Sequence, residues 1–141
     1  MHKHILVKAT VDSPTKDPQV IEKWLSDLVT KVDMEIFLPP AAKYCDDPNN
    51  AGVTGTVVIT TSHASIHLWD HGLLQMDLYS CKNFSAEDVL EHIKDSFSVL
   101  EGSYLIADRD TLGVSKWKKF KSKSMSQHFM SFWNALKRFF R

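Results

Sequence analysis

The chain of 141 residues contains little cysteine and little glycine, and it has no long apolar run. Its two cysteines, Cys45 and Cys81, are too few for the disulfide framework of a small secreted protein. The N-terminus, Met1–Ile5, lacks the apolar region of a secretory signal, and no stretch reaches the length of a membrane span. We therefore expect a cytoplasmic protein rather than a secreted cystine scaffold or a membrane channel.

Acidic residues are missing from the C-terminal part of the chain. All 17 aspartates and glutamates lie at or before Asp110. The first 114 residues contain nine lysines and arginines and carry a formal charge of −8, whereas the last 27 residues carry +8. A block asymmetry of this kind separates an acidic body from a basic segment. We predict one acidic domain over residues 1–112 and a basic amphipathic helical tail over residues 113–141.

Hydrophobic periodicity predicts the elements of the acidic body. Asp17-Pro18 is typical of a helix start, and apolar residues then recur at helical spacing up to Val32. Ser85 is expected to cap a second helix. Strands are predicted at residues 5–11, 34–38 and 104–107, with further strands between 54 and 81. The order predicts an α+β fold, a two-layer α/β sandwich with a mainly antiparallel sheet and both helices on one face.

Two places in this body are predicted to lack regular structure. Pro39-Pro40 should stop the strand at residues 34–38, and the polar stretch from Ala41 to Gly52 should form a loop. His71-Gly72 should form a tight turn between two strands.

Residues 52–81 hold an unusual number of histidines and hydroxyl groups for a pair of strands. His63, His67 and His71 share one face of a strand if that strand is regular, which raises the alternative of a metal site. No acidic residue or cysteine lies at a matching spacing, so we expect no metal. By the same spacing, Thr54 and Ser62 are expected to share one face of their strand.

Four short motifs with fixed internal distances lie in this region. They are Gly-Val-Thr-Gly, Thr-Ser-His, Ser-Ile-His-Leu-Trp and Asp-Leu-Tyr-Ser-Cys, at residues 52–55, 61–63, 65–69 and 77–81. Together they resemble the prokaryotic-type S-adenosylmethionine decarboxylases, a family of self-cleaving, pyruvoyl-dependent proenzymes. The resemblance extends from about Ile5 to Ile106 and is strongest over residues 52–81.

The resemblance implies how the chain makes its own cofactor. Decarboxylation of an amino acid leaves a carbanion that needs an electron sink, and a covalently held carbonyl that forms a Schiff base supplies one. The resemblance implies that the Ser62 hydroxyl attacks the Thr61 carbonyl, and that the chain breaks between these residues. Ser62 then becomes the pyruvoyl group at the start of the second chain.

The family pattern also implies roles for other residues. Thr54 matches the hydroxyl residue that assists the first step, His67 the base for elimination, and Cys81 the acid that returns a proton to the substrate. Phe37, Trp69 and Asp70 match the substrate-binding positions. The resemblance further implies spermidine biosynthesis and a homodimer of cleaved protomers with sites near the subunit interface.

The sequence departs from the family pattern at three substrate-binding positions. Thr61 replaces a glutamate that helps to hold the substrate, and Asp70 replaces a glutamate that binds ribose hydroxyls. An insertion from Pro40 to Ala51 separates Phe37 from the Gly-Val-Thr-Gly motif. Arginine or ornithine therefore stands as an alternative substrate, because relatives on this fold decarboxylate them. A further alternative is an uncleaved regulatory or binding subunit, in which Ser62, His67 and Cys81 are structural.

The basic tail has no counterpart in the family pattern. Trp117, Phe120 and several later aromatic residues recur at helical spacing among lysines and arginines. We expect this tail to pack against the acidic body or a second subunit. Weak contact with an anionic membrane surface is the alternative, and no nucleic-acid partner is expected.

Overall fold

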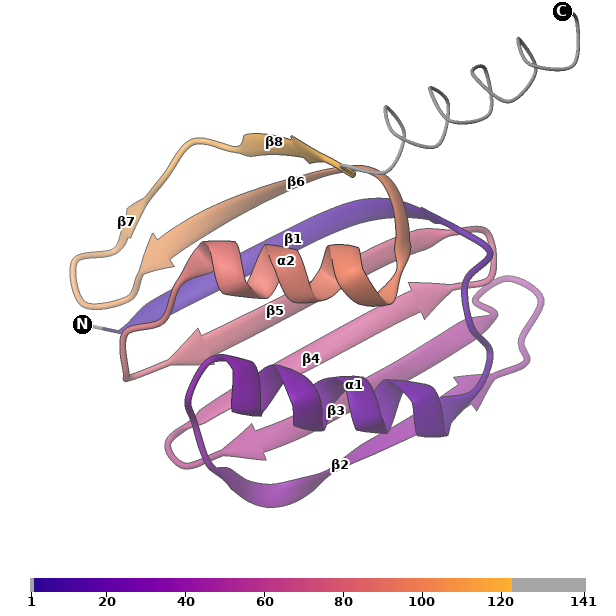
Figure 1. Ribbon diagram of the computed structural model, residues 1–141, viewed down its shortest axis with the longest axis horizontal. Helices are drawn as coiled ribbons and strands as arrows, with labels where there is room; N and C mark the ends of the chain where they lie inside the picture. The colour runs from indigo at the N-terminus through magenta and orange to yellow at the C-terminus, as the bar shows by residue number, and fades with distance from the viewer. Residues whose placement is uncertain (1, 123–141) are drawn as a thin grey trace, which may run out of the picture.

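The computed structural model describes residues 2–122, which form one antiparallel sheet and two helices (Figure 1). Along the chain the elements are β1 (Lys3–Asp12), α1 (Pro18–Lys31), β2 (Ile36–Cys45), β3 (Gly52–Ile59), β4 (Ser62–Trp69), β5 (Leu73–Ser80), α2 (Ala86–Ser96), β6 (Ser98–Asp108), β7 (Gly113–Val114) and β8 (Lys118–Lys121). The strand order is β2-β3-β4-β5-β1-β6-β7, with β8 also paired to β6. The predicted α+β sandwich is confirmed.

Both helices begin where the sequence places their caps. The Asp17 carboxylate accepts a hydrogen bond from the Gln19 N–H at 2.9 Å, and Pro18 occupies the first turn, where its missing N–H costs nothing. The Ser85 hydroxyl accepts from the Asp88 N–H at 3.2 Å. Each helix then packs one apolar stripe onto the sheet; the buried residues of α1 are Ile21, Trp24, Leu25, Leu28 and Val29.

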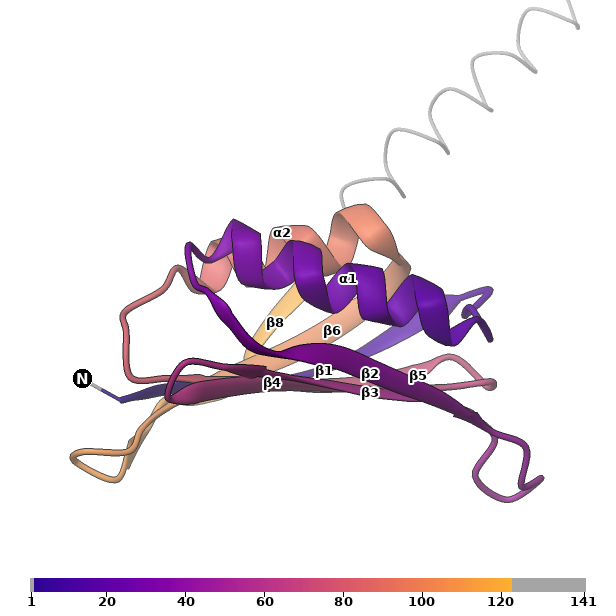
Figure 2. The same cartoon turned by 90° about the horizontal axis from the view of Figure 1, so that it is seen from below.

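The two faces of the sheet differ in chemistry. Figure 2 shows α1 and α2 on the same side of the strands, with the other side bare. Strand residues that point toward the helices are apolar and buried, among them Ile5, Val7, Val53, Val57, Ala64, Ile66, Leu68, Leu74 and Leu78. Their neighbours along the strands, such as Thr54, Thr56 and Gln75, are exposed and polar. We call this uncovered side the open face.

Strand β2 is longer than the sequence predicts. It runs through Pro39-Pro40 to Cys45, so the prediction of a loop from Ala41 is wrong for the first half of that stretch. Among the described strands, β2 pairs only with β3, and its register shifts on either side of Leu38. An edge strand tolerates proline because one row of its N–H groups needs no ladder partner. After the two prolines, the Ala42 N–H donates to the Glu22 carboxylate at 3.0 Å.

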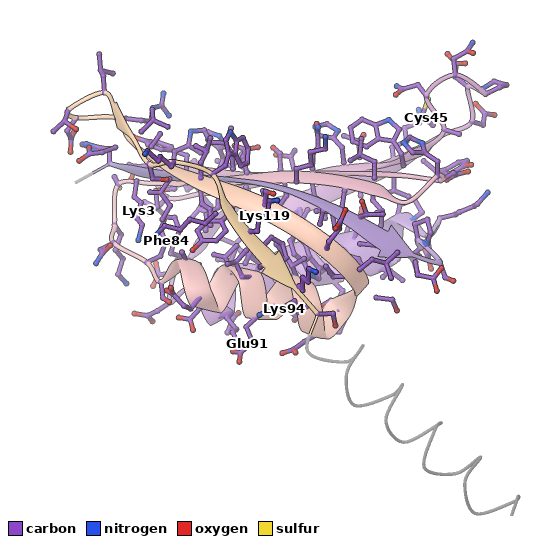
Figure 3. All side chains as sticks on the ribbon, turned by 90° about the horizontal axis from the view of Figure 1, so that it is seen from above. Lys3, Cys45, Phe84, Glu91, Lys94 and Lys119 are labelled. Atoms are coloured by element: carbon purple, nitrogen blue, oxygen red, sulfur yellow. The ribbon has the colours of Figure 1, made fainter. Side chains whose placement is uncertain are left out.

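Lys3 ties β1 to the segment that leads into α2. Its ammonium donates to the Phe84 carbonyl at 2.6 Å and lies 4.8 Å from the centre of the Phe84 ring (Figure 3). The contact joins the end of the sheet that carries Ser80 to the start of the helical layer.

The described part of the predicted helical tail is not helical. Residues 113–121 contribute β7 and β8, which pair with β6, and Lys119 lies on β8 beside it (Figure 3). The ring of Phe120 packs on Gly102, where a Cβ atom would collide with it, and lies near Tyr104. Pairing satisfies the backbone of β6, which outweighs the weak helical spacing of Trp117 and Phe120. The rest of the predicted tail, 123–141, lies outside the described residues.

In the part of the chain that the structure describes, neither helix is long and apolar enough to cross a membrane.

Candidate active site

The turn between β3 and β4 holds a conformation that its sequence does not favour. Ile59 pairs with Ser62, so Thr60 and Thr61 alone connect the strands. Thr61 has φ +58°, in the left-handed region. A β-branched residue is an outlier there, and such backbone strain costs about 1–3 kcal/mol. This strained residue supplies the carbonyl group of the Thr61–Ser62 peptide bond.

Ser62 and Cys81 meet at this end of the sheet. His63 pairs with Tyr79, so the antiparallel register brings Cys81 opposite Thr61. The Cys81 N–H donates to Ser62 Oγ at 3.3 Å, and Ser62 Oγ lies 3.9 Å from Cys81 Sγ. Thr61 Oγ1 lies 2.6 Å from the same sulfur. The structure therefore brings together three residues that the resemblance singled out, and Ser62 is buried, with 7% of its surface exposed.

Hydrogen bonding adjusts the acidity of the Cys81 thiol. The Thr61 hydroxyl is the main influence that lowers the pKa of Cys81 below its ordinary value, and the Ser62 hydroxyl adds to it. Desolvation of the thiol by its neighbours acts in the opposite direction. A hydrogen bond to the thiolate stabilises its charged form, so Cys81 gives up its proton at a lower pH than an ordinary thiol does.

Replacing Thr61 with valine is expected to raise the pKa of Cys81, because valine keeps the branched shape but cannot donate to the thiolate. Absorbance of the thiolate in the ultraviolet, followed during a pH titration, measures this pKa. Cys45 is a second free thiol, so both the reference protein and the variant should carry Cys45→Ala. A pKa that stays the same or falls in Thr61→Val would contradict the assignment of this hydrogen bond.

A second group of predicted residues lies on the open face. Thr54 on β3 pairs with His67 on β4, and Thr54 Oγ1 lies 3.1 Å from His67 Nδ1. The ring of Trp69 lies 5.7 Å from that of His67. The prediction that Thr54 and Ser62 share one face of one strand is wrong, because the Thr60-Thr61 turn puts them on different strands. Thr54 is exposed, whereas Ser62 is buried.

Within one chain the two groups are far apart. Ser62 and His67 are five residues apart on β4, which corresponds to about 17 Å along an extended strand. An odd spacing also directs the two side chains to opposite faces of the sheet. The burial pattern of β4 agrees, since Ser62 alternates with the buried set and His67 with the exposed one.

The predicted substrate-binding residues do not form one cluster. Phe37 is 68% exposed on the edge strand β2, near the Thr61 end of the sheet. Trp69 and Asp70 lie at the opposite end of β4. There the Trp69 indole donates to the Asn50 side-chain oxygen at 2.8 Å.

Asp70 is held by two neighbours. Its Oδ2 accepts from the Tyr44 hydroxyl at 2.7 Å and pairs with the Lys16 ammonium at 2.8 Å. Both contacts lower the pKa of Asp70 below its ordinary value, and the contact with Lys16 has the larger effect. The other carboxylate oxygen, Oδ1, is buried and has no hydrogen-bond partner within residues 2–122.

One cluster on the open face was missed by the sequence analysis. His4 Nε2 lies 2.8 Å from Asp77 Oδ2, and His63 Nε2 lies 3.5 Å from the same oxygen. Among the residues described, these three could hold a metal ion, with their ligand atoms within 4.8 Å of one another. The carboxylate already accepts a hydrogen bond from the His4 ring, which needs no ion. His67 faces Thr54 instead, and His71 lies in the following turn, so the histidine triplet does not converge.

No sequence signal could have joined His4 to Asp77. The two residues are 73 positions apart and meet only because β1 pairs with β5. Tyr79 packs against the rings of His4 and His63, with ring centres 5.9 and 5.6 Å away. These ring contacts fix the side chains of the cluster on the open face, and His63 directly follows Ser62 in sequence.

Comparison with known proteins agrees with the motifs at this site. The sequence model of a family described as S-adenosylmethionine decarboxylase matches residues 3–110. A protein of Methanococcus aeolicus, named S-adenosylmethionine decarboxylase proenzyme, is 30% identical over 97 residues, which cover 66% of this chain and 80% of the relative. A protein of Pyrococcus horikoshii with the same name is 28% identical over 98 residues, which cover 67% and 68%.

The similarity is more local in other relatives. A proenzyme of the same name from Acidithiobacillus ferrooxidans is 32% identical over 68 residues, and the chain spans about half of that relative's length, 51%. The family match nevertheless covers nearly the whole sheet and both helices. The chain belongs to the S-adenosylmethionine decarboxylase family.

Proposed function

We propose that the protein is a pyruvoyl-dependent S-adenosylmethionine decarboxylase of spermidine biosynthesis that cleaves itself between Thr61 and Ser62. The observation that carries the proposal is the geometry of this peptide bond. A strained Thr61 precedes the bond, and the nucleophile that follows it, Ser62, is buried and accepts a hydrogen bond from the Cys81 backbone. The name proenzyme, which the relatives share, agrees with a chain that is processed.

Self-cleavage would proceed in two stages. Ser62 Oγ attacks the Thr61 carbonyl carbon, the amide C–N bond breaks, and the freed nitrogen takes up the hydroxyl proton, which leaves an ester. A base then removes the Ser62 α-proton and the Cβ–O bond breaks, so that Thr61 departs as a carboxylate. The remaining enamine tautomerises to an imine, and water hydrolyses it to the pyruvoyl carbonyl with release of ammonia. Release of strain at Thr61 favours the first stage.

The finished pyruvoyl group would supply the electron sink that decarboxylation requires. Cys81 lies beside the residue that becomes this group, and its sulfur is 3.9 Å from Ser62 Oγ. A thiol beside the new carbonyl can give up a proton to the substrate and regain one from water within one turnover. We therefore assign to Cys81 the return of a proton to the substrate's α-carbon.

We infer that a second copy of the chain completes the site. Thr54 and His67 form a hydrogen-bonded pair on the open face, about 17 Å along β4 from Ser62. That separation is too long for His67 to remove the α-proton of Ser62 in its own chain. A homodimer that brings the open face of one copy to the Ser62 end of the other would supply the pair in trans.

The substrate-binding residues are where this chain departs from the family pattern. Asp70 is engaged by Lys16 and Tyr44, so it would bind ribose hydroxyls through a carboxylate that is already partly neutralised. Arginine and ornithine, which lack a ribose, are therefore included as competing substrates. Both cysteines are free thiols, which agrees with a protein that acts in the reducing cytoplasm.

Two measurements test the proposal. Intact mass under denaturing conditions should give chains of 61 and 80 residues, with a ketone in place of the amine of Ser62 on the longer chain. Release of labelled carbon dioxide from carboxyl-labelled S-adenosylmethionine should exceed release from arginine and ornithine. A chain that stays whole would contradict the proposal and favour a non-catalytic subunit. A cleaved chain that prefers arginine or ornithine would contradict the substrate alone.

A further inference from the structure

We propose that Trp117, on the segment that follows the family-matched region, is a wall of the substrate-binding cavity and sets the affinity for the substrate. The inference rests on the proposed function and extends it to a residue outside the match, which ends at residue 110. Trp117 belongs to the link between β7 and β8, and 55% of its surface is exposed. An exposed indole at this place has no role in the hydrophobic core.

An irregularity in strand pairing directs Trp117 away from the sheet edge. The Ser115 N–H donates to the Ile106 carbonyl at 2.8 Å, and the Ile106 N–H donates back to Ser115 Oγ at 2.9 Å. Regular pairing resumes at Lys118, opposite Tyr104. Two residues, 116 and 117, therefore stand opposite one residue, 105. This is the arrangement of a β-bulge, which re-aims a side chain and is frequent beside active sites.

The indole borders a cavity on the open face. The cavity has a volume of about 350 Å³ and is walled by β1, β4 and β5 together with Trp117. Its polar groups belong to His4, Lys8, His67, Gln75 and Asp77. His67 lines this cavity, and the proposed function brings the open face of one copy to the Ser62 end of another. In that dimer an occupant of the cavity would lie beside the pyruvoyl group of the partner copy.

The chemistry of this wall suits the proposed substrate. An indole face attracts a flat aromatic base by stacking and an organic cation by its electron-rich surface. S-adenosylmethionine carries both, as an adenine and a sulfonium. Trp69 also lies near His67, and its indole nitrogen is already engaged by Asn50. Phe37, the family's aromatic position, lies on the edge strand at the other side of the sheet.

Kinetics of the purified, cleaved protein with S-adenosylmethionine test this role. Trp117→Ala is expected to raise KM about tenfold with kcat changed less than about twofold, because the indole is assigned to binding and not to proton transfer. Trp117→Phe should keep most of the affinity. Leu112→Ala is the matched control, since Leu112 is 83% exposed on the turn before β7 and borders none of the described cavities. Its KM should equal that of the unaltered protein.

Three results would overturn the role of Trp117 and leave the proposed function standing. The first is a cleaved, active Trp117→Ala protein with an unchanged KM. The second is a fall in kcat without a rise in KM. The third is a rise in KM that disappears at high protein concentration and accompanies dissociation in light scattering, since Trp117 would then act at a subunit contact. Failure of the unaltered protein to cleave would instead count against the proposed function.

Discussion

Ser62→Ala is expected to abolish self-cleavage completely and to leave a single species of 16.1 kDa. Alanine has no hydroxyl to attack the Thr61 carbonyl, so the ester cannot form and no pyruvoyl group can arise. The substitution removes one buried oxygen whose described partners are the Cys81 N–H and thiol. The cost of leaving that N–H unpaired, about 1–3 kcal/mol, is compatible with a folded domain. Intact mass reports the cleavage, and circular dichroism reports the fold.

Ser65→Ala is the matched control for this experiment. Ser65 lies on the same strand as Ser62, on the open face, where its hydroxyl lies 3.0 Å from Thr56 Oγ1. The control should cleave as completely as the unaltered protein, because Ser65 is not adjacent to the Thr61–Ser62 bond. Cleavage of Ser62→Ala at the same bond would show that another group is the nucleophile.

The sequence predicts the parts of this fold that depend on local pattern. Alternation of apolar and polar residues identifies the central strands, and Asp17 and Ser85 mark the helix starts, because capping needs only residues within one turn. Pro39-Pro40 misleads for a physical reason. Proline excludes a central strand, but the structure places these residues on an edge, and edge position is a property of the whole sheet.

The sequence likewise predicts some features of the candidate site and not others. The motifs indicate Thr54, Thr61, Ser62, His67 and Cys81, because the family pattern preserves their spacing in sequence. Their division into two groups could not be read from that spacing, since it depends on where the two-residue turn falls. A turn at Thr60-Thr61 sends Ser62 to the buried side and leaves His67 exposed. The His4–Asp77–His63 cluster depends entirely on the register of three strands.

The division into two groups leads to a test by complementation between chains. His67→Ala alone is expected to form no pyruvoyl group, because it lacks the base for elimination, and Ser62→Ala alone lacks the nucleophile. Co-expressed, the two variants can form a mixed dimer in which one site contains both Ser62 and His67. About half of the His67→Ala chains should then be cleaved if the copies pair at random in equal amounts.

Mass spectrometry identifies which chain has been processed. The longer product should carry the His67→Ala substitution and a mass lower than that of a serine-started chain by one ammonia. Processing of the Ser62→Ala chain is impossible in this scheme. His71→Ala is the matched control, since His71 lies in the turn after β4 and should cleave without a partner variant.

The two possible outcomes separate two arrangements of the same residues. A mixture in which neither chain is processed would mean that His67 acts on Ser62 of its own chain. The start of β4 would then have to move by most of the 17 Å that separates them. Cleavage confined to the His67→Ala chain would mean that the open face of one copy serves the strained turn of another. The bare side of the sheet would then be part of the active site, which accounts for its polar character.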